Sequence, residues 1–507
     1  MTIDRREFLR RVAAGSAIVT IPAWLQGCGV QTASLLGPAP PDNPFLDWFG
    51  IDETRVVSLM STLTAGGADI ADIYFQHAKS SRLMLQDGVV GNAESEVLLG
   101  AGMRVVHDDV VGFAFTDELS PEALAWTAVQ AGKGGDLAPS RSFTTRSPGD
   151  LYTVEMSWSD TGLEAKSAIL QKLDAMARAA DPSISRVALG WDDIDERVLI
   201  ATLNGELVAD VRPMARITLV VTAVRDGETQ TGFASIAARA GIDWFSEEHL
   251  KKLVDTGVAR TLVQFDARRV PVAELPVILA AGESGVLLHE AVGHALEGDL
   301  VADGSSPYAD KVGELIASEQ VSLVDDAAMP HERGALNVDD EGTVAGRVRL
   351  VEQGKLRSFL HDHRSGLAAG ATSTGSGRRE SYRHQPLPRM SCTRLEDGPH
   401  SREEIIASAD RAIICETYPG GRADLGAGDF RFSVKNGWLV ENGRVTAPVK
   451  DFAILGNGPD LLGKISMVGN DGRMDPGGWT CGKKGQNVPV SQGMPTVLVD
   501  SLIVESA

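Results

Sequence analysis

Two histidines and a glutamate stand close together at His289, Glu290 and His294. Two imidazoles on one element can hold a zinc-type ion, and an adjacent carboxylate can take a proton from metal-bound water. These residue types therefore predict a metal site that activates water for hydrolysis. We expect His289 and His294 to be ligands and Glu290 to be the general base.

The spacing of the two histidines differs from the H-E-x-x-H zinc motif, in which they are four residues apart. Here His294 follows His289 by five residues. On a regular helix, five steps of about 100° place the second side chain about 140° from the first. An undistorted helix cannot direct both rings at one ion, so we expect a π-bulge between them. Gly293 would supply the backbone freedom for it.

The residues before the motif predict a strand, a turn and then a helix. Residues 276–281 form an apolar run that is typical of a buried strand. Residues 282–285 are typical of a turn, in which Ser284 is a candidate N-cap for the following helix. Ionisable side chains on a buried helix need partners, and a shared metal ion would supply one.

The block GESGVLLHEAVGHALEGD, residues 282–299, closely resembles the signature of the TldD/PmbA metallopeptidases, specifically of their metal-bearing TldD branch. Three further blocks are similar to the same family and follow in the same order, at residues 375–382, 465–471 and 480–486. The similarity extends from about Ala71 to Val504 and is densest in the C-terminal half.

The resemblance implies a third metal ligand. In that family a cysteine near the C-terminus completes the site, and the matching position is Cys481. A thiolate is a good zinc ligand, and two histidines with one cysteine leave a fourth position for water. The alternative for Cys481 is a small buried hydrophobe, the usual role of a free cysteine.

The resemblance also implies a function and partners. We expect metal-dependent proteolysis of extended, unfolded or small peptides, with one divalent metal ion, zinc, as cofactor. A dimer is implied, either a homodimer or a heterodimer with a related family member. Two alternatives are a non-hydrolytic, metal-holding peptide-binding lipoprotein of the cell envelope and a metal-dependent amidase acting on cell-wall peptides. Glu290 argues against the first, because a binding protein needs no base beside its metal.

The N-terminal residues predict export. Arg5 and Arg6 lie in a segment that resembles a twin-arginine signal, and an uncharged apolar stretch follows at residues 12–24. This stretch is short for a membrane span and suits a signal peptide. Residues 25–28 resemble a lipoprotein processing box, so Cys28 is a candidate for lipidation. We expect the protein in the periplasm or cell envelope, attached to a membrane only through its N-terminus; an uncleaved anchor is the alternative.

The composition suits a soluble exported enzyme. The chain has 507 residues, of which 43% are hydrophobic. Its 48 basic and 69 acidic residues give a net charge of −21, which argues against nucleic acid as a partner. Besides Cys28 and Cys481 the chain contains Cys392 and Cys415. These two could form a disulfide, although two buried thiols are favoured.

We expect an α+β fold. An N-terminal domain has helices flanking an antiparallel sheet, and a strand-rich, barrel-like C-terminal domain carries the metal-binding helix. In the C-terminal half, Asn436-Gly437 and Asn442-Gly443 are typical of turns between strands. The expected parts are the signal and lipobox (1–28), a Pro-rich linker (29–44), the N-terminal scaffold and dimerisation domain (45–268) and the metallopeptidase domain (269–507).

Two polar clusters lie outside the main motif. His361 and His363 are a candidate second metal site, because alternation along a strand would place both rings on one side. Arg378, Arg379 and Tyr382 are candidate substrate-binding residues, since guanidinium groups bind carboxylates and carbonyls. An internal salt-bridge network is the equal alternative for the two arginines.

Two carboxylates follow the second histidine, at Glu297 and Asp299. Either could hydrogen-bond the ring of His294 and fix its orientation. The alternative is that both only cap and solvate the end of the helix.

Overall fold

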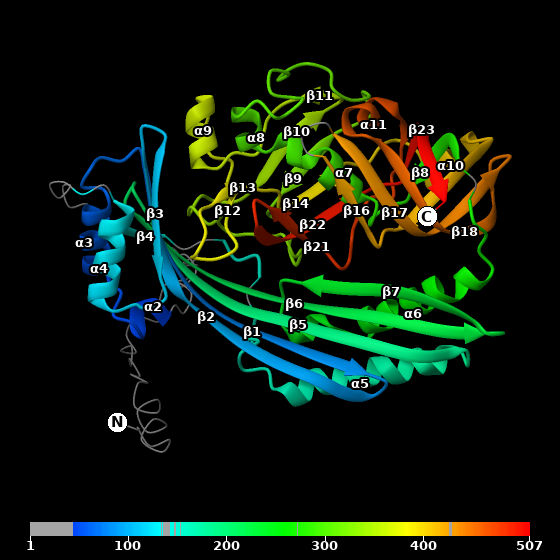
Figure 1. The fold of residues 1–507 in the computed structure, drawn as a ribbon, viewed down its shortest axis with the longest axis horizontal. Helices are drawn as coiled ribbons and strands as arrows, with labels where there is room; N and C mark the ends of the chain where they lie inside the picture. The colour runs from blue at the N-terminus through cyan, green and yellow to red at the C-terminus, as the bar shows by residue number, and fades with distance from the viewer. Residues whose placement is uncertain are drawn as a thin grey trace, which may run out of the picture. The chain divides into compact units, whose positions relative to one another are not determined.

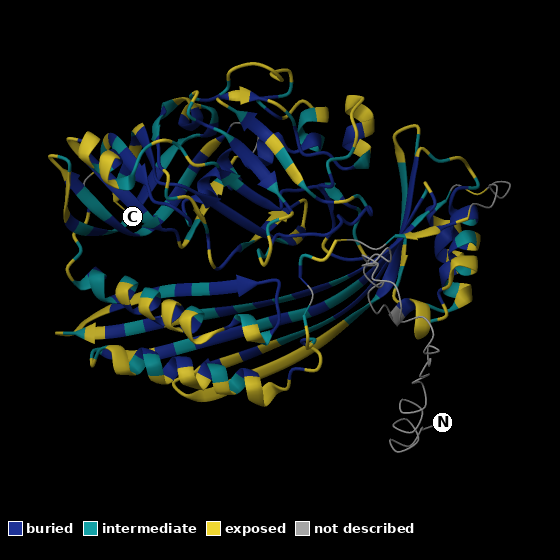
Figure 2. Ribbon diagram, turned by 180° about the vertical axis from the view of Figure 1, so that it is seen from behind, coloured by how far each residue is buried: buried dark blue, intermediate teal, exposed yellow. Residues whose placement is uncertain are grey.

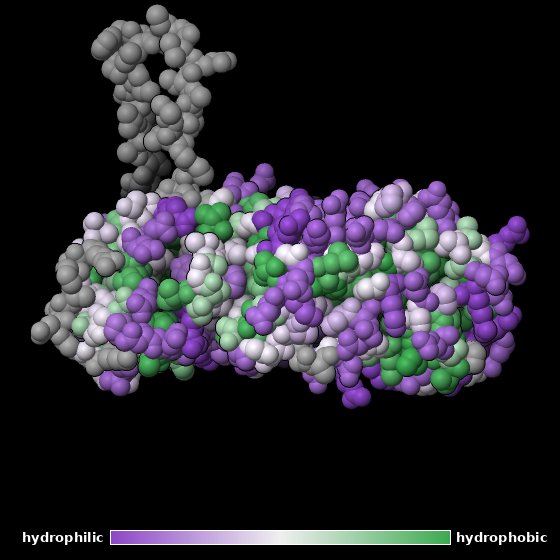
Figure 3. Space-filling view, turned by 90° about the horizontal axis from the view of Figure 1, so that it is seen from above, coloured by the Kyte–Doolittle hydropathy of each residue, from purple (hydrophilic) through white to green (hydrophobic). Residues whose placement is uncertain are grey.

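The computed structural model describes residues 44–132, 134, 142–146, 149–152, 154–270, 272–424 and 428–506. The twin-arginine segment, the apolar stretch after it and Cys28 lie outside these residues. In the described ranges no helix is both long enough and apolar enough to cross a membrane. Seen from above, the hydrophobic side chains of one face form separate patches among hydrophilic ones (Figure 3).

The N-terminal half is built on one long sheet (Figure 1). Asp-Gly turns with positive φ at Asp87-Gly88 and Asp226-Gly227 join neighbouring antiparallel strands, as these dipeptides predict. The main path is β3 (Val110–Thr116), β2 (Val89–His107), β1 (Ile70–Gln86), β5 (Ile184–Thr202), β6 (Glu206–Arg225) and β4 (Thr144–Arg146), with β7 (Glu228–Ala238) also pairing with β6.

Side-chain alternation gives this sheet two different faces. Odd-numbered residues such as Phe75, Leu83 and Trp191 belong to apolar clusters that the helices cover. Ser120 caps helix α4, and Pro121 occupies its first turn, where the fixed φ of proline suits a helix. The covering helices are α3 (Glu53–Leu63) and α4 (Pro121–Ala131) at one end, and α5 (Leu163–Ala180) and α6 (Glu247–Leu262) at the other.

The C-terminal half contains a closed five-stranded barrel. Hydrogen-bonded pairing runs through β15 (Arg411–Thr417), β8 (Ala273–Leu279), β23 (Val497–Ser506), β18 (Arg444–Asn457) and β17 (Asp429–Glu441), and returns to β15. A second sheet has the order β11 (Lys355–Leu356), β10 (Arg347–Glu352), β9 (Leu323–Asp326), β14 (Cys392–Leu395), β22 (Gln486–Met494) and β20 (Arg473–Met474). The expected α+β class with a barrel-like C-terminal domain is confirmed.

Shorter elements connect these sheets. Helix α7 (Gly285–Ala291) follows β8 and shares the apolar core of the barrel. Strand β21 (Trp479–Lys483) pairs with β22. The others are α2 (Pro44–Asp47), α8 (Gly298–Ala302), α9 (His363–Ala369), α10 (Arg402–Ser408), α11 (Gly458–Lys464), β12 (Gly377–Arg378), β13 (Leu387–Pro388), β16 (Gly420–Ala423), β19 (Ile465–Val468), and the 3-10 turns η2 (Ile242–Trp244), η3 (Val263–Phe265) and η4 (Gly293–Leu296).

One of the two expected Asn-Gly turns is wrong. Asn442-Gly443 does turn the chain between β17 and β18, with φ of 52° and 70°. Asn436-Gly437 instead lies within β17. A β carbon on Gly437 would overlap the carbonyl oxygen of Ile414 in β15. The glycine is there because β15 and β17 approach closely to close the barrel.

Buried charged side chains join the even-numbered face of the long sheet to the C-terminal half. Asp72 lies 2.6 Å from Arg104 on the neighbouring strand and 2.7 Å from Arg379 of the C-terminal half. Arg104 also reaches Glu341, at 2.5 Å. Burial opposes ionisation of Asp72, but the two arginines outweigh it and hold its pKa below the usual range. The carboxylate is therefore charged, paired and enclosed.

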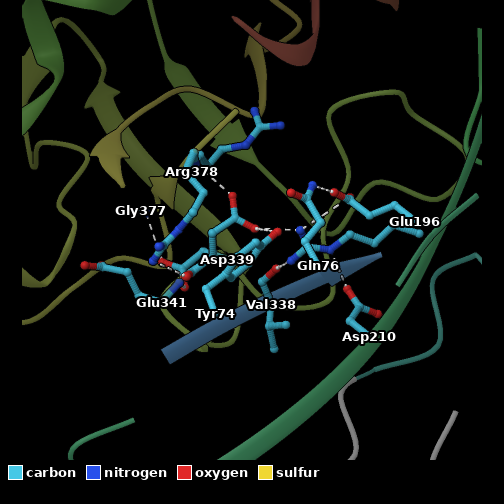
Figure 4. Close-up of polar contacts among 12 residues, drawn as sticks. Tyr74, Gln76, Glu196, Asp210, Val338, Asp339, Glu341, Gly377 and Arg378 are labelled. Carbon is cyan, nitrogen blue, oxygen red and sulfur yellow. Dashed lines mark hydrogen bonds and ion pairs between the residues drawn. The ribbon is translucent and has the colours of Figure 1, made fainter. Parts of the chain in front are cut away.

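A second group of buried ion pairs also joins the sheet to the C-terminal half. Arg212 of β6 binds Asp340 at 2.6 Å and Asp210 at 2.9 Å. The segment that carries Asp340 also meets the sheet through Asn337, whose amide donates to Asp210 at 3.0 Å. Figure 4 shows this segment, labelled at Val338, lying against β1. These polar contacts join the two halves beside a small apolar cluster of Tyr74, Val198, Ile200 and Tyr382.

We predict that Asp72→Asn lowers the free energy of unfolding by about 3–5 kcal/mol, because it leaves two buried guanidinium groups without their shared carboxylate. Urea unfolding measures the change. The control is Asp192→Asn on the adjoining strand, whose partner Arg82 is 58% exposed; its loss should be about 1 kcal/mol or less. Equal losses in the two variants would contradict a special role for the buried network.

Candidate metal site

The α-helix that carries His289 ends before His294 is reached. Val292 leaves helical geometry, with φ −128° and ψ −51°, and a 3-10 turn at Gly293–Leu296 carries the second ring. The expected π-bulge is therefore wrong. The α-helix ends instead of widening into a π-bulge. The change in chain direction after it places the ring centroids of His289 and His294 5.0 Å apart.

Two local features of the motif have roles other than those expected. Gly293 does not adopt a positive φ; a β carbon there would overlap the sulfur of Met390, so close packing requires the glycine. Ser284 stands at the N-cap position but makes no capping hydrogen bond. Its hydroxyl lies 3.0 Å from that of Tyr418, which ties the start of the helix to the chain after β15.

Cys481 reaches the two histidines from strand β21. One ligand atom from each of His289, His294 and Cys481 lies within 4.8 Å of the other two. The Cys481 Sγ is 3.4 Å from Nε2 of His294. All three side chains are buried, with 1–2% of their surface exposed. The structure thus brings together the three predicted ligands, although Cys481 follows His294 by 187 residues.

The environment of His289 fits a metal ligand. Both of its ring nitrogens are buried, and neither has a hydrogen-bond partner among the described residues. Leaving a buried polar group unsatisfied costs roughly 1–3 kcal/mol, so an unshared imidazole here would destabilise the fold. Two imidazoles and a thiolate match the ligands of catalytic zinc sites, which keep one position open.

Local charges favour the thiolate form of Cys481. Burial raises the pKa of the thiol, but attraction to the rings of His289 and His294 outweighs burial and lowers the pKa to about 4. Burial alone would lower the pKa of His294, but Glu297 and Cys481 outweigh burial and raise this pKa well above its usual value. These interactions favour the thiolate, which is the form that binds metal ions.

Glu297 fixes the ring of His294. Its Oε2 lies 2.9 Å from Nδ1, which leaves Nε2 for a ligand. Lys483 holds the same carboxylate at 2.8 Å. Burial raises the pKa of Glu297, but His294 and Lys483 outweigh it and lower the pKa to about 2. Of the two candidate carboxylates, Glu297 orients the histidine, whereas Asp299 binds Lys483 and Lys484 at 2.5 and 2.8 Å.

Two residues that support the site, Lys483 through Glu297 and Arg389 through Cys481, were not predicted from the sequence. Lys483 lies two positions further along β21, so strand alternation places it on the same side as Cys481; that periodicity was the available signal. Arg389 donates to the carbonyl oxygen of Cys481 at 2.6 Å. No sequence signal could identify Arg389, because the contact joins segments 92 residues apart.

Glu290 lies at the edge of the three-residue cluster. Its Oε2 is 3.8 Å from Nε2 of His294. Its side chain is 33% exposed, against 2% for His294. A carboxylate that faces both solvent and the site is placed to accept a proton from water.

His361 and His363 do not come together as a second site. Nδ1 of His361 lies 3.2 Å from the Ser365 hydroxyl, and Nε2 of His363 lies 2.8 Å from the Thr343 hydroxyl. The expected strand alternation is wrong, because Asp362 caps a helix that begins at His363. Within the described part of the chain, neither histidine belongs to a group of three metal-ligating side chains.

Arg378, Arg379 and Tyr382 lie between the two halves of the protein. Arg378 donates to the carbonyl oxygens of Met390 and Pro489, at 2.7 and 2.6 Å. Arg379 pairs with Asp72, and Tyr382 is fully buried. Arg379 thus matches the internal salt-bridge network that the sequence left open, whereas Arg378 has no ion-pair partner among the described residues.

The chain is similar to metallopeptidases over most of its length. Models of the PmbA/TldA metallopeptidase family match residues 71–133 (domain 1), 157–265 (central domain) and 273–506 (C-terminal domain). A metalloprotease TldD homolog from Haemophilus influenzae is 33% identical, over 91% of this chain and 98% of the relative. A relative from Saccharolobus solfataricus, named a zinc metalloprotease TldD homolog, is 27% identical over 86% and 97% of the two chains.

A solved structure shares the fold. The crystal structure of TldE from Thermococcus kodakarensis aligns with a TM-score of 0.70 and 20% sequence identity. The alignment covers 89% of this chain and 99% of that one. At 20% identity, this comparison shows that the two proteins share an arrangement of helices and strands.

We predict that Cys481→Ala removes most of the bound zinc, because the remaining imidazoles supply two ligands instead of three. Elemental analysis of purified, folded protein measures the stoichiometry. Cys415→Ala is the matched control, since Cys392 and Cys415 are buried free thiols outside the cluster. Full zinc content in Cys481→Ala would remove this residue from the site.

Proposed function

Because the chain belongs to the TldD/PmbA metallopeptidase family, we propose that it hydrolyses peptide bonds with a zinc ion held by His289, His294 and Cys481. The observation that carries the proposal is the position of Glu290. It lies beside the buried cluster, one third exposed, and outside the set of three ligands. A site that only stored metal would need no such carboxylate.

The side chains divide the chemistry among them. When bound, the ion polarises the peptide carbonyl and stabilises the charge that develops on its oxygen. Glu290 accepts a proton from the attacking water and passes it to the leaving amine. Glu297 keeps Nε2 of His294 directed at the site, and Lys483 keeps Glu297 ionised.

We propose extended, unfolded or small peptides as substrates. The three ligands are buried, so a folded polypeptide would have to open before a peptide bond reached them. Among the described strands, β21 pairs with β22 alone. Its other edge offers backbone groups to which an extended chain can hydrogen-bond.

We further propose that the protein acts outside the cytoplasm and as a dimer. Arg5-Arg6 and the apolar stretch after them support export, and residues 25–28 support a lipid anchor on Cys28. A dimer with an identical or related subunit would enclose the site further.

The export proposal predicts that replacing both Arg5 and Arg6 with Lys retains the unprocessed precursor in the cytoplasm. Fractionation with immunoblotting follows the protein. Cys28→Ser should be exported but released from the membrane fraction. If Cys28→Ser is processed and membrane-bound as the unmodified protein is, lipidation at this residue is contradicted while export stands.

For the catalytic proposal, Glu290→Gln should keep zinc and fold but lose peptidase activity by roughly 100-fold or more, because the amide cannot accept the proton. Cleavage of an unstructured peptide library, followed by mass spectrometry, measures the loss. Glu403→Gln, at an exposed helix start, is the control. Full activity in zinc-loaded Glu290→Gln would overturn the assigned role.

A further inference from the structure

The even-numbered face of the long sheet borders a groove beneath the C-terminal half. Two cavities of about 420 and 610 Å³ lie along it. Both are lined by Ser80, Glu96, Ile194 and Met214. The shared lining makes them adjoining parts of one groove.

Five arginines line this groove without an ion-pair partner among the described residues; Arg383 is exposed, and the other four are buried or partly buried. Arg239 and Arg378 line the smaller cavity, and Arg216 and Arg333 line the larger one. Burying an unpaired charge is costly. Other arginines on the same sheet face avoid that cost, because Arg82, Arg104 and Arg212 pair with Asp192, Asp72 and Asp340.

The guanidinium groups of Arg216 and Arg239 keep hydrogen-bond donors unused. Arg216 has no hydrogen-bond partner in the described part of the chain, and its Nε is buried. Arg239 donates through Nε to the carbonyl oxygen of Arg333 at 3.1 Å and lies over the Tyr152 ring. Its two terminal nitrogens have no described partner, although only 3% of the residue is exposed.

Arg333 connects this arginine cluster to the metal site. It donates to the carbonyl oxygen of Trp479 at 2.6 Å and to the Thr480 hydroxyl at 3.2 Å. Thr480 precedes the ligand Cys481 on β21. Burial, with repulsion from Arg216 and Arg239, lowers the pKa of Arg333 to about 9. Arg333 thus contacts both Arg239 and the strand that carries Cys481.

We propose that the arginine cluster (Arg216, Arg239, Arg333 and Arg378) binds a carboxylate of the peptide substrate, either its C-terminus or an acidic side chain. This inference rests on the proposed function. A guanidinium fork matches the two oxygens of a carboxylate. Among the carboxylates that line the larger cavity, Asp192 is already paired with Arg82 and Asp193 with Lys166. The anchored peptide would lie beside the strand that carries Cys481.

Binding of short labelled peptides tests the proposal. The protein is zinc-loaded Glu290→Gln, and the probes are an Ala/Gly pentapeptide with a free C-terminal carboxylate, its C-terminal amide, and the amide with one internal Glu. Fluorescence anisotropy should show the free acid binding about tenfold tighter than the plain amide. Recovery of affinity by the internal Glu would extend the site to side-chain carboxylates, and no recovery would restrict it to the C-terminus.

Matched variants test whether the arginine cluster causes the preference for the free acid. Arg216→Gln and Arg239→Gln should abolish the preference for the free acid, and Arg216→Lys should retain part of it. Arg225→Gln is the control, because Arg225 lies on the same strand but pairs with Asp181 and does not line the groove. Circular dichroism checks the fold of each variant.

Two outcomes would overturn the carboxylate site. The first is equal binding of acid and amide peptides to zinc-loaded Glu290→Gln. The second is a folded Arg216→Gln that keeps the tenfold preference. The anisotropy assay measures binding and not cleavage. If the unmodified protein failed to cleave peptides, the proposed function would be contradicted, but the outcome of the binding assay would not change.

Discussion

The burial of two imidazole rings and a thiol at one point is the constraint on which the surrounding structure depends. Each group would be costly to bury without a partner. Glu297 satisfies the outer nitrogen of His294, and Lys483 satisfies Glu297 in turn. Arg389 holds the backbone at Cys481. The ring nitrogens of His289 are left without a described partner, and this is the feature that fits a shared ion best.

The cost of burying a charged group without a partner also explains the two different faces of the large sheet. Its odd-numbered face is apolar and covered by four helices, which are visible below and beside the strands in Figures 1 and 2. Its even-numbered face carries charges. Where the sheet meets the C-terminal half directly, Asp72 and Arg212 each have an oppositely charged partner across the contact. Where the surfaces separate, the groove begins, and Arg216, Arg239, Arg333 and Arg378 along it lack carboxylate partners among the described residues.

Features that depend on neighbouring residues were accessible from the sequence. The Asn442-Gly443 turn and the α+β class with a barrel-like second half agree with the structure. Features that depend on contacts between distant segments were not. The glycine of Asn436-Gly437 was read as a turn, but it is explained by the approach of β15. The five-residue histidine spacing was read as a π-bulge, but the helix ends at Ala291 instead.

By itself, the sequence determined the chemistry available to this protein: two imidazoles with a carboxylate between them, and, through family resemblance, one distant cysteine. Only the tertiary structure decided how these groups meet. It placed Cys481 at 3.4 Å from His294, selected Glu297 over Asp299 as the orienting carboxylate, and enclosed Arg379 in an internal ion pair. The reason is that short-range sterics and hydrogen bonding act along the chain, whereas burial and charge pairing depend on which distant segments share one core.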